Sequence, residues 1–284
     1  MKNLTRNNMK QTKTCVLMMT LLTTIGIGSV YAQNSSGTVQ DRINSGYAAY
    51  ENGRYDSAIA DFSEAIRRNP NEAVLYFLRG EAYREKENYD SAIADYSQAI
   101  RLIRSDGELY GVGRGTWVKL SNTSLYASRG RAYSDKGDYD LAIADFSEAI
   151  RRDSDNADLY NDRAYTYCEK KDYNRAIADY TQALRLDPDN AVFYGNRGMA
   201  YSDKKDYDQA IADFTQALRL DSNDENSFSA WLYNNRGLAF ERKGTYFQAI
   251  ADYNQAISLD PVDTDLRANL ERVQQLQSRS SRTR

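Results

Sequence analysis

The sequence predicts an all-α solenoid, in which six helix hairpins stack on one another and a last helix caps the array. The first observation is a repeat, since residues 125–153 recur almost unchanged at 159–187 and 193–221, at a spacing of 34 residues. A fixed period of this length is typical of solenoids. The second is that each copy has two stretches with apolar and small residues at helical spacing, separated by a short turn. One such hairpin cannot bury its own apolar face, so we expect the copies to stack.

The chain begins with a segment, residues 1–32, that has the pattern of a secretory signal peptide. Basic residues come first, an apolar stretch follows, and Val30-Tyr31-Ala32 offers small residues where a signal peptidase would read them. An uncleaved anchor is the alternative, but the apolar run is shorter than the ~20 residues that span a bilayer. We therefore expect cleavage near Ala32–Gln33, export to the periplasm or the medium if the source is bacterial, and a polar leader at 33–38.

Six repeats are expected after the leader, each a pair of helices. In the third repeat, Lys136-Gly137-Asp138 is the predicted turn. Gly130 and Ala142 are small because the two helices must approach closely there, and aromatic residues at helical spacing fill the space around them. The approximate bounds of the repeats are 39–72, 73–106, 123–156, 157–190, 191–224 and 230–263.

An insertion separates the second and third repeats, because Gly80 and Gly130 lie 50 positions apart instead of 34. It falls near residues 103–122, where several glycines break any helix and the apolar residues around them favour a short hairpin. One interpretation is a tolerated surface loop, and the other is a flap over a binding surface. Trp117 favours the flap.

The chain ends with a predicted capping helix at residues 264–277. Leu266, Leu270 and Val273 recur there at helical spacing, and atypical terminal units cap solenoids. Residues 278–284 contain three arginines and are expected to form a mobile basic tail.

The repeat unit resembles the tetratricopeptide repeat (TPR) family. That family has a large, a small and an aromatic residue at set positions of its first helix, and a small–aromatic pair in its second. These positions hold Tyr126, Gly130, Tyr133, Ala142 and Phe146 in the third repeat. Arg129 departs from the pattern, which has Leu there. The resemblance covers about residues 39–262 and implies a right-handed superhelix, with a concave groove that binds other proteins.

Composition excludes several kinds of function. The net charge of −3 and the lack of a long basic run argue against nucleic acid as a partner. There is no histidine, which removes Ser-His-Asp and Cys-His triads and every His-ligated zinc site. The cysteines are Cys15 and Cys168 only, so there is no disulfide framework. We therefore expect no catalytic residues, no metal and no cofactor.

The candidate site follows from the resemblance, because the second, fifth, ninth and twelfth residues of each first helix line the groove in that family. Arg84 and Arg131 would give this groove local positive charge. Each residue has an alternative role, which is to fill gaps between first helices. The predicted groove residues are Tyr47, Tyr50, Phe77, Glu81, Arg84, Arg131, Asn161, Tyr165, Met199, Trp231, Asn234 and Leu238.

A repeated pair of charged residues is expected to have a structural role and not a binding role. An Asp recurs at one position of every second helix, and an Arg at one position of every first helix except the first, which has Ser45. We expect these residues to form an Arg–Asp tie at helix–helix contacts, with a structural role.

The function that these observations predict is an exported, non-enzymatic TPR-repeat scaffold that binds a partner protein or peptide in its groove. An alternative is a structural solenoid that self-associates through its ends or flanks. A carboxylate-based enzyme is a remote alternative, since no carboxylate pairs with a nucleophile at a convincing spacing.

Overall fold

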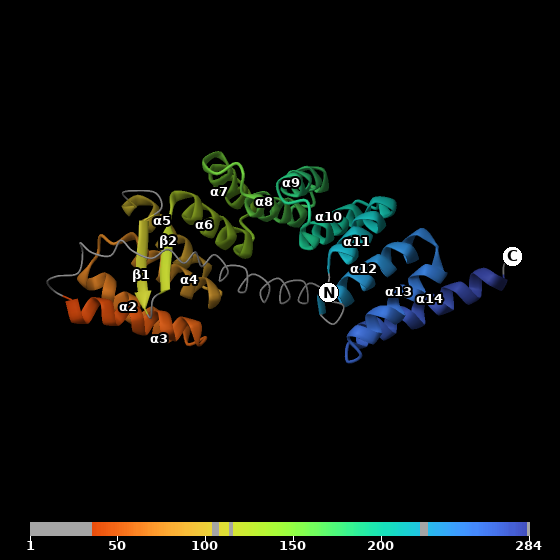
Figure 1. Ribbon diagram of the computed structural model, residues 1–284, viewed down its shortest axis with the longest axis horizontal. Helices are drawn as coiled ribbons and strands as arrows, with labels where there is room; N and C mark the ends of the chain where they lie inside the picture. The colour runs from red at the N-terminus through yellow and green to blue at the C-terminus, as the bar shows by residue number, and fades with distance from the viewer. Residues whose placement is uncertain (1–35, 104–107, 114–115, 222–226, 283–284) are drawn as a thin grey trace. The chain divides into compact units, whose positions relative to one another are not determined.

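The structure is a computed structural model that describes residues 36–103, 108–113, 116–221 and 227–282. The predicted signal peptide lies outside these residues. Residues 36–187 and 188–282 belong to two compact units, which we describe separately. Each unit consists of stacked helix hairpins, so the fold is an all-α solenoid in which the two strands of the insertion are the only sheet of the described residues (Figure 1).

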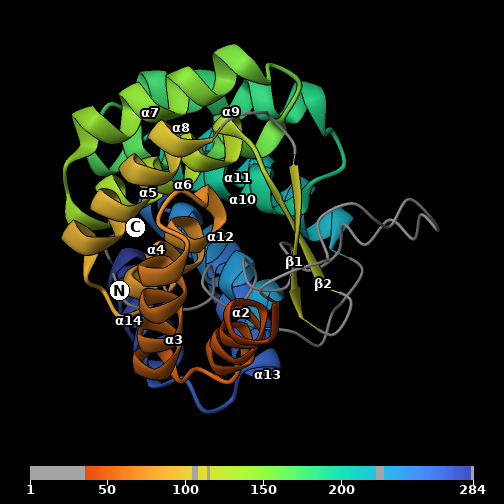
Figure 2. The ribbon, with the colours of Figure 1, turned by 90° about the vertical axis from the view of Figure 1, so that its left-hand side faces the viewer.

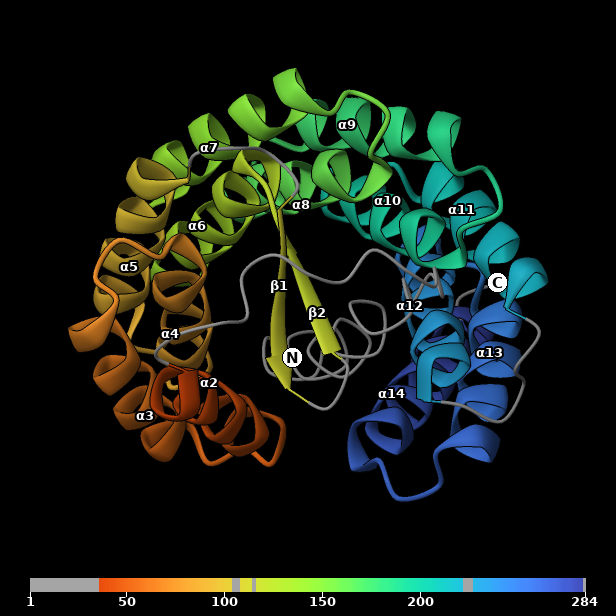
Figure 3. The same ribbon diagram turned by 60° about the vertical axis from the view of Figure 1, so that its left-hand side comes forward.

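In the first unit, the first helices of the hairpins form one layer and the second helices form the other (Figure 3). The first-helix layer contains α2 (Ser36–Glu51), α4 (Ala73–Glu85), α6 (Asn122–Lys136) and α8 (Ala157–Glu169). The second-helix layer contains α3 (Tyr55–Arg68), α5 (Tyr89–Leu102), α7 (Tyr139–Arg152) and α9 (Tyr173–Leu186). Helix α2 begins at Ser36, so it includes the last three residues of the predicted polar leader.

The insertion of the first unit forms an antiparallel hairpin of β1 (Glu108–Gly113) and β2 (Thr116–Leu120). Leu120 pairs with Glu108 and Val118 pairs with Tyr110, with an irregularity between Gly111 and Gly113. Strand β1 lies against α2, on the side of the first-helix layer (Figures 2 and 3). The predicted short hairpin is therefore confirmed.

The second unit contains α10 (Ala191–Asp203), α11 (Tyr207–Leu220), α12 (Ser227–Lys243), α13 (Tyr246–Leu259) and α14 (Thr264–Arg282). Helix α14 packs on α13, with Leu266 and Val273 buried. It continues through residues 278–282, so the prediction of a mobile tail from residue 278 is wrong for these residues. The physical reason is that no glycine or proline interrupts the helix after Pro261.

The hairpin turns use left-handed backbone conformations. Gly137 is the C-cap of α6 and has a φ of 96°, a conformation that glycine adopts more readily than other residues. The equivalent positions of two later hairpins are occupied by Lys171 and Lys205, with φ of 61° and 69°. Each following helix begins at a tyrosine, and the side chain of Asp172 accepts a hydrogen bond from the N–H of Arg175 at the start of α9.

Within a hairpin, a first-helix glycine contacts an aromatic ring of the second helix. A Cβ added at Gly130 would lie 3.0 Å from Phe146, and one added at Gly80 would lie 2.8 Å from Tyr96. Both rings are almost completely buried. The prediction that Gly130 allows the close approach of two helices is confirmed.

The predicted Arg–Asp tie is also confirmed. Arg163 donates from Nε and Nη2 to the two carboxylate oxygens of Asp179, at 2.7 and 2.8 Å, and from Nη1 to Ser147 of the preceding hairpin, at 3.0 Å. Its guanidinium carbon lies 5.9 Å from the ring centroid of Tyr160. Equivalent salt bridges form in four other hairpins, between Arg79 and Asp95, Arg129 and Asp145, Arg197 and Asp213, and Arg236 and Asp252. In the first hairpin, Arg42 and Ser45 both bind Asp61, at 2.7 Å.

Candidate functional site

Aromatic rings mark the first of the predicted groove residues. Tyr47 and Tyr50 stack with ring centroids 6.4 Å apart, and the edge of Tyr50 meets Tyr55 at 5.7 Å. All three rings are partly exposed. Tyr47 and Tyr50 are neighbours on α2 because the helical period places residues three apart on one face, and Tyr55 is the first residue of α3.

A charged network begins one helix further along, on α4. Arg84 lies between Glu81 and Glu85, with Nη2 at 3.3 and 3.1 Å from their carboxylates. Its Nη1 lies 3.7 Å from the carboxylate of Asp135 on α6. The Nε atom of Arg84 is buried and has no hydrogen-bond partner in the described residues. Glu81 also accepts a hydrogen bond from the hydroxyl of Tyr96, at 2.7 Å.

The network continues from α6 to α8. Nε of Arg131 donates to the carboxylate of Asp162 at 2.6 Å, and the Asp162 side chain is only 5% exposed. We call the residues of this network the charged strip: Glu81, Arg84, Glu85, Arg131, Asp135 and Asp162.

The expectation of local positive charge at Arg84 and Arg131 is wrong. In the charged strip four carboxylates share two guanidinium groups, so the strip has an excess of negative charge. The predicted groove residues include both arginines of the strip but only one of its four acids, Glu81. Glu85 and Asp135 each stand one residue beyond the twelfth position, which is why the family pattern missed them.

Neighbouring charges shift the pKa values of the charged strip. Burial alone would raise the pKa of the Glu81 carboxyl, but Arg84, the Tyr96 hydroxyl and Arg131 lower it below its ordinary value. Burial raises the pKa of Tyr50, and the carboxylates of Glu81 and Glu85 raise it further. Glu81 is therefore ionised, and Tyr50 remains a neutral hydroxyl at physiological pH.

The other predicted residues of the first unit are occupied by packing. Phe77 lies 6.2 Å from the ring of Tyr96 and contacts the core. Asn161 is only 7% exposed, so it offers little surface to a partner. Tyr165 and Cys168 are partly exposed, and both lie close enough to Tyr180 to raise its pKa, after burial as the larger cause. For Phe77 and Asn161, filling the space between helices is the better interpretation.

In the second unit, the predicted residues also belong mainly to packing. Trp231 stacks on Phe228 at 5.8 Å and meets the edge of Phe214 at 6.2 Å. Met199 and Leu238 contact buried clusters. Asn234 accepts a hydrogen bond from the side chain of Asn269 on α14, at 2.9 Å.

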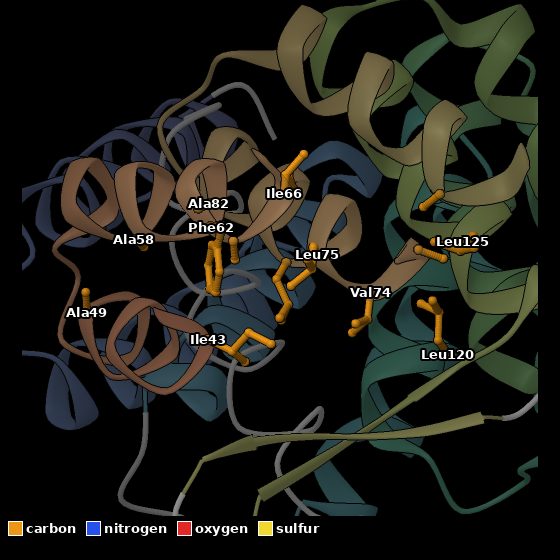
Figure 4. Packing of buried hydrophobic residues seen from close by; sticks show 14 residues of the cluster. Ile43, Ala49, Ala58, Phe62, Ile66, Val74, Leu75, Ala82, Leu120 and Leu125 are labelled. Carbon is orange, nitrogen blue, oxygen red and sulfur yellow. The ribbon is translucent and has the colours of Figure 1, made fainter. Parts of the chain in front are cut away.

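The β hairpin covers part of the first-helix layer of the first unit. Leu120 is fully buried, and Val118 is partly buried, in a cluster that includes Ile43 of α2 and Val74 of α4 (Figure 4). Ile43 and Val74 are 9% and 3% exposed. The hairpin therefore covers apolar residues in the middle of α2 and at the beginning of α4, whereas Tyr50, Glu85 and Asp135 lie near the ends of their helices.

Two further features bear on the chemistry. Among the residues that the structure describes, no group of three or more His, Cys, Asp or Glu side chains is placed to hold a metal ion. Within those same residues, every helix is too short or too polar to pass through a lipid bilayer.

Comparison with known proteins agrees with the architecture. Models of the tetratricopeptide repeat match residues 43–107, 128–191, 191–224 and 232–263. No curated protein matched the chain in a sequence search.

Solved structures show the same fold. The Cut9–Hcn1 hetero-tetramer of the APC/C aligns with a TM-score of 0.60 and 20% identity over 82% of this chain, which spans only 42% of that chain. YrrB, described as a TPR protein with an unusual peptide-binding site, aligns with a TM-score of 0.53 and 20% identity over 74% of this chain and 97% of its own. MamA from Desulfovibrio magneticus RS-1 aligns with a TM-score of 0.55 and 17% identity, over 68% and 97%.

Proposed function

The chain belongs to the tetratricopeptide repeat family, and from that premise we propose that it is an exported, non-enzymatic scaffold that binds a partner protein or peptide. The binding surface is the first-helix layer, which corresponds to the groove predicted from the sequence. TPR proteins typically bind protein or peptide partners, and YrrB is described as having a peptide-binding site.

One observation carries this proposal. The repeated Arg–Asp ties and the glycine–aromatic contacts already account for the packing of each hairpin. Tyr47, Tyr50 and the charged strip come in addition to that packing, and most of them are partly exposed. The residues at the repeat positions of Tyr47 and Tyr50 differ from one hairpin to the next. Side chains that differ between otherwise identical repeats are the ones available for recognition.

The mechanism is rigid presentation. Since every first helix is held by its own second helix, the surface is formed before the partner arrives, and binding orders only the partner. The chain has no histidine to serve as the general base of a serine or cysteine nucleophile.

A pull-down compares matched variants of the mature chain. The first, Tyr50→Ala with Tyr165→Ala, changes the proposed surface. The control, Leu141→Ala with Phe247→Ala, removes two apolar side chains that are 51% and 74% exposed on second helices. We expect the first variant to lose the specific partners that the wild type and the control retain. Capture of the same partners by all three would contradict the proposal.

Export is tested separately. We expect the mature chain outside the cytoplasm, with a new N-terminus near Gln33, as determined by fractionation and mass spectrometry of the intact protein. A full-length chain confined to the cytoplasm would contradict export but would leave the binding surface untouched.

A further inference from the structure

The β hairpin restricts what the first-helix layer of the first unit can bind. Leu120 and Val118 belong to the same buried apolar cluster as Ile43, in the middle of α2, and Val74, at the beginning of α4 (Figure 4). A partner that relies on an apolar helix face would have to displace the fully buried Leu120, which is unfavourable. The apolar part of this layer is therefore already filled by the chain itself.

The remaining surface of this layer is acidic and aromatic. Glu85 and Asp135 have side chains that are 29% and 32% exposed, and both share Arg84 with Glu81. Glu51, at the end of α2, is exposed and close enough to Tyr47 to raise its pKa, burial being the larger cause. Tyr50 and Tyr55 extend this surface with partly exposed rings.

Building on the proposed function, we propose that this surface binds an extended, basic segment of the partner, in which lysine or arginine side chains alternate with small residues. The cationic groups pair with Glu85, Asp135 and Glu51, and their carbon chains lie against the rings of Tyr47 and Tyr50. Cations are attracted to the faces of tyrosine rings, so this arrangement favours lysine and arginine side chains.

The charge balance decides between a basic and an acidic segment. Arg84 and Arg131 are already bound by carboxylates, and Asp162 is almost completely buried beside Arg131. An acidic segment could reach these arginines only by leaving carboxylates without partners, which is unfavourable. A basic segment instead adds positive charge where negative charge is in excess.

The experiment measures fluorescence anisotropy with three labelled peptides of equal length: alternating Lys and Ser, alternating Glu and Ser, and an amphipathic leucine-rich helix. We expect the lysine peptide to bind the mature chain, the glutamate peptide to show no measurable binding, and the leucine-rich peptide to bind more weakly than the lysine peptide. Binding of the lysine peptide should weaken as the salt concentration rises.

Matched variants locate the site. Glu85→Gln with Asp135→Asn removes two charges from the proposed surface, whereas Glu64→Gln with Glu148→Gln removes two from second helices and leaves the same net charge. We expect the first pair to weaken lysine-peptide binding roughly tenfold and the second less than about twofold. Thermal unfolding of each variant checks folding, and the salt dependence of the wild type is a measurement that needs no variant.

Three outcomes would overturn the inference: tighter binding of the glutamate or leucine-rich peptide, equal weakening by both pairs, or binding of the lysine peptide that salt does not affect. If the lysine peptide fails while the Tyr50/Tyr165 variant still loses its captured partners, the basic segment is wrong and the scaffold function stands. If both fail, the binding surface itself is wrong.

Discussion

At the scale of the residue, the Arg–Asp tie explains why the chain departs from its family pattern. Arg163 bonds Asp179 in its own hairpin and Ser147 in the preceding one, so one side chain links two repeats. A leucine could fill the space but could not bind the nearly buried Asp179. The recurrence of Arg and Asp made this pair predictable. The hydrogen bond to Ser147 was not predictable, because it joins two different repeats.

The tie predicts a large loss of stability when the arginine is removed. Arg163→Ala leaves a nearly buried carboxylate without its partner, so we expect the free energy of unfolding to fall by about 2–4 kcal/mol, somewhat below the value for a fully buried pair. Urea unfolding measures this. The control is Arg151→Ala, because that side chain is 67% exposed and its loss should have a much smaller effect. Equal effects of the two changes would contradict a structural role.

In the hairpin turns, by contrast, a substitution is expected to raise the free energy of unfolding. Lys171 has a φ of 61°, a conformation that costs a side chain with a Cβ about 1–2 kcal/mol. Lys171→Gly should therefore raise the free energy of unfolding by about 0.5–1 kcal/mol, after the greater freedom of glycine in the unfolded chain is subtracted. The reverse change, Gly137→Lys, should lower it by a similar amount. A stabilising Gly137→Lys, measured by the same urea titration, would show that this turn imposes no such strain.

At the scale of the element, the helices and the β hairpin were predictable from the sequence, but the elements against which they pack were not. The helical spacing of apolar residues predicted the helices, and the glycines and apolar residues of 103–122 predicted the β hairpin. That it packs on α2, from the first repeat, depends on contacts between segments far apart in the sequence, such as β1 with α2. Likewise, Arg131 and Asp162 belong to different repeats, and a pattern defined within one repeat does not pair them.

The packing of the β hairpin predicts that substitutions at the adjacent residues Leu120 and Lys119 affect stability very differently. Leu120 is fully buried and Lys119 is exposed. Leu120→Ala should lower the free energy of unfolding by about 2–4 kcal/mol and speed proteolysis within residues 108–120, whereas Lys119→Ala should do neither. Equal proteolysis of the two variants and the wild type would mean that the hairpin is a loose surface loop.

At the scale of the whole molecule, stability is a sum over neighbouring repeats and specificity lies in the residues that differ among them. The last helix supports this division of roles. Leu266 and Val273 face α13, whereas Arg267, Glu271 and Gln274 are exposed on α14. The exposed positions of α14 are mostly polar, which disfavours end-to-end assembly through this helix.

The central claim is that partners bind the first-helix layer of the first unit and not the second helices. Site-specific photo-crosslinking tests it most directly, with a benzophenone amino acid placed at Tyr50 or, as the control, at the exposed Leu141 of α7. We predict that irradiation of cells producing each variant gives discrete adducts of higher mass from position 50 and none from position 141. Adducts from position 141 alone, or the same adducts from both positions, would contradict the claim.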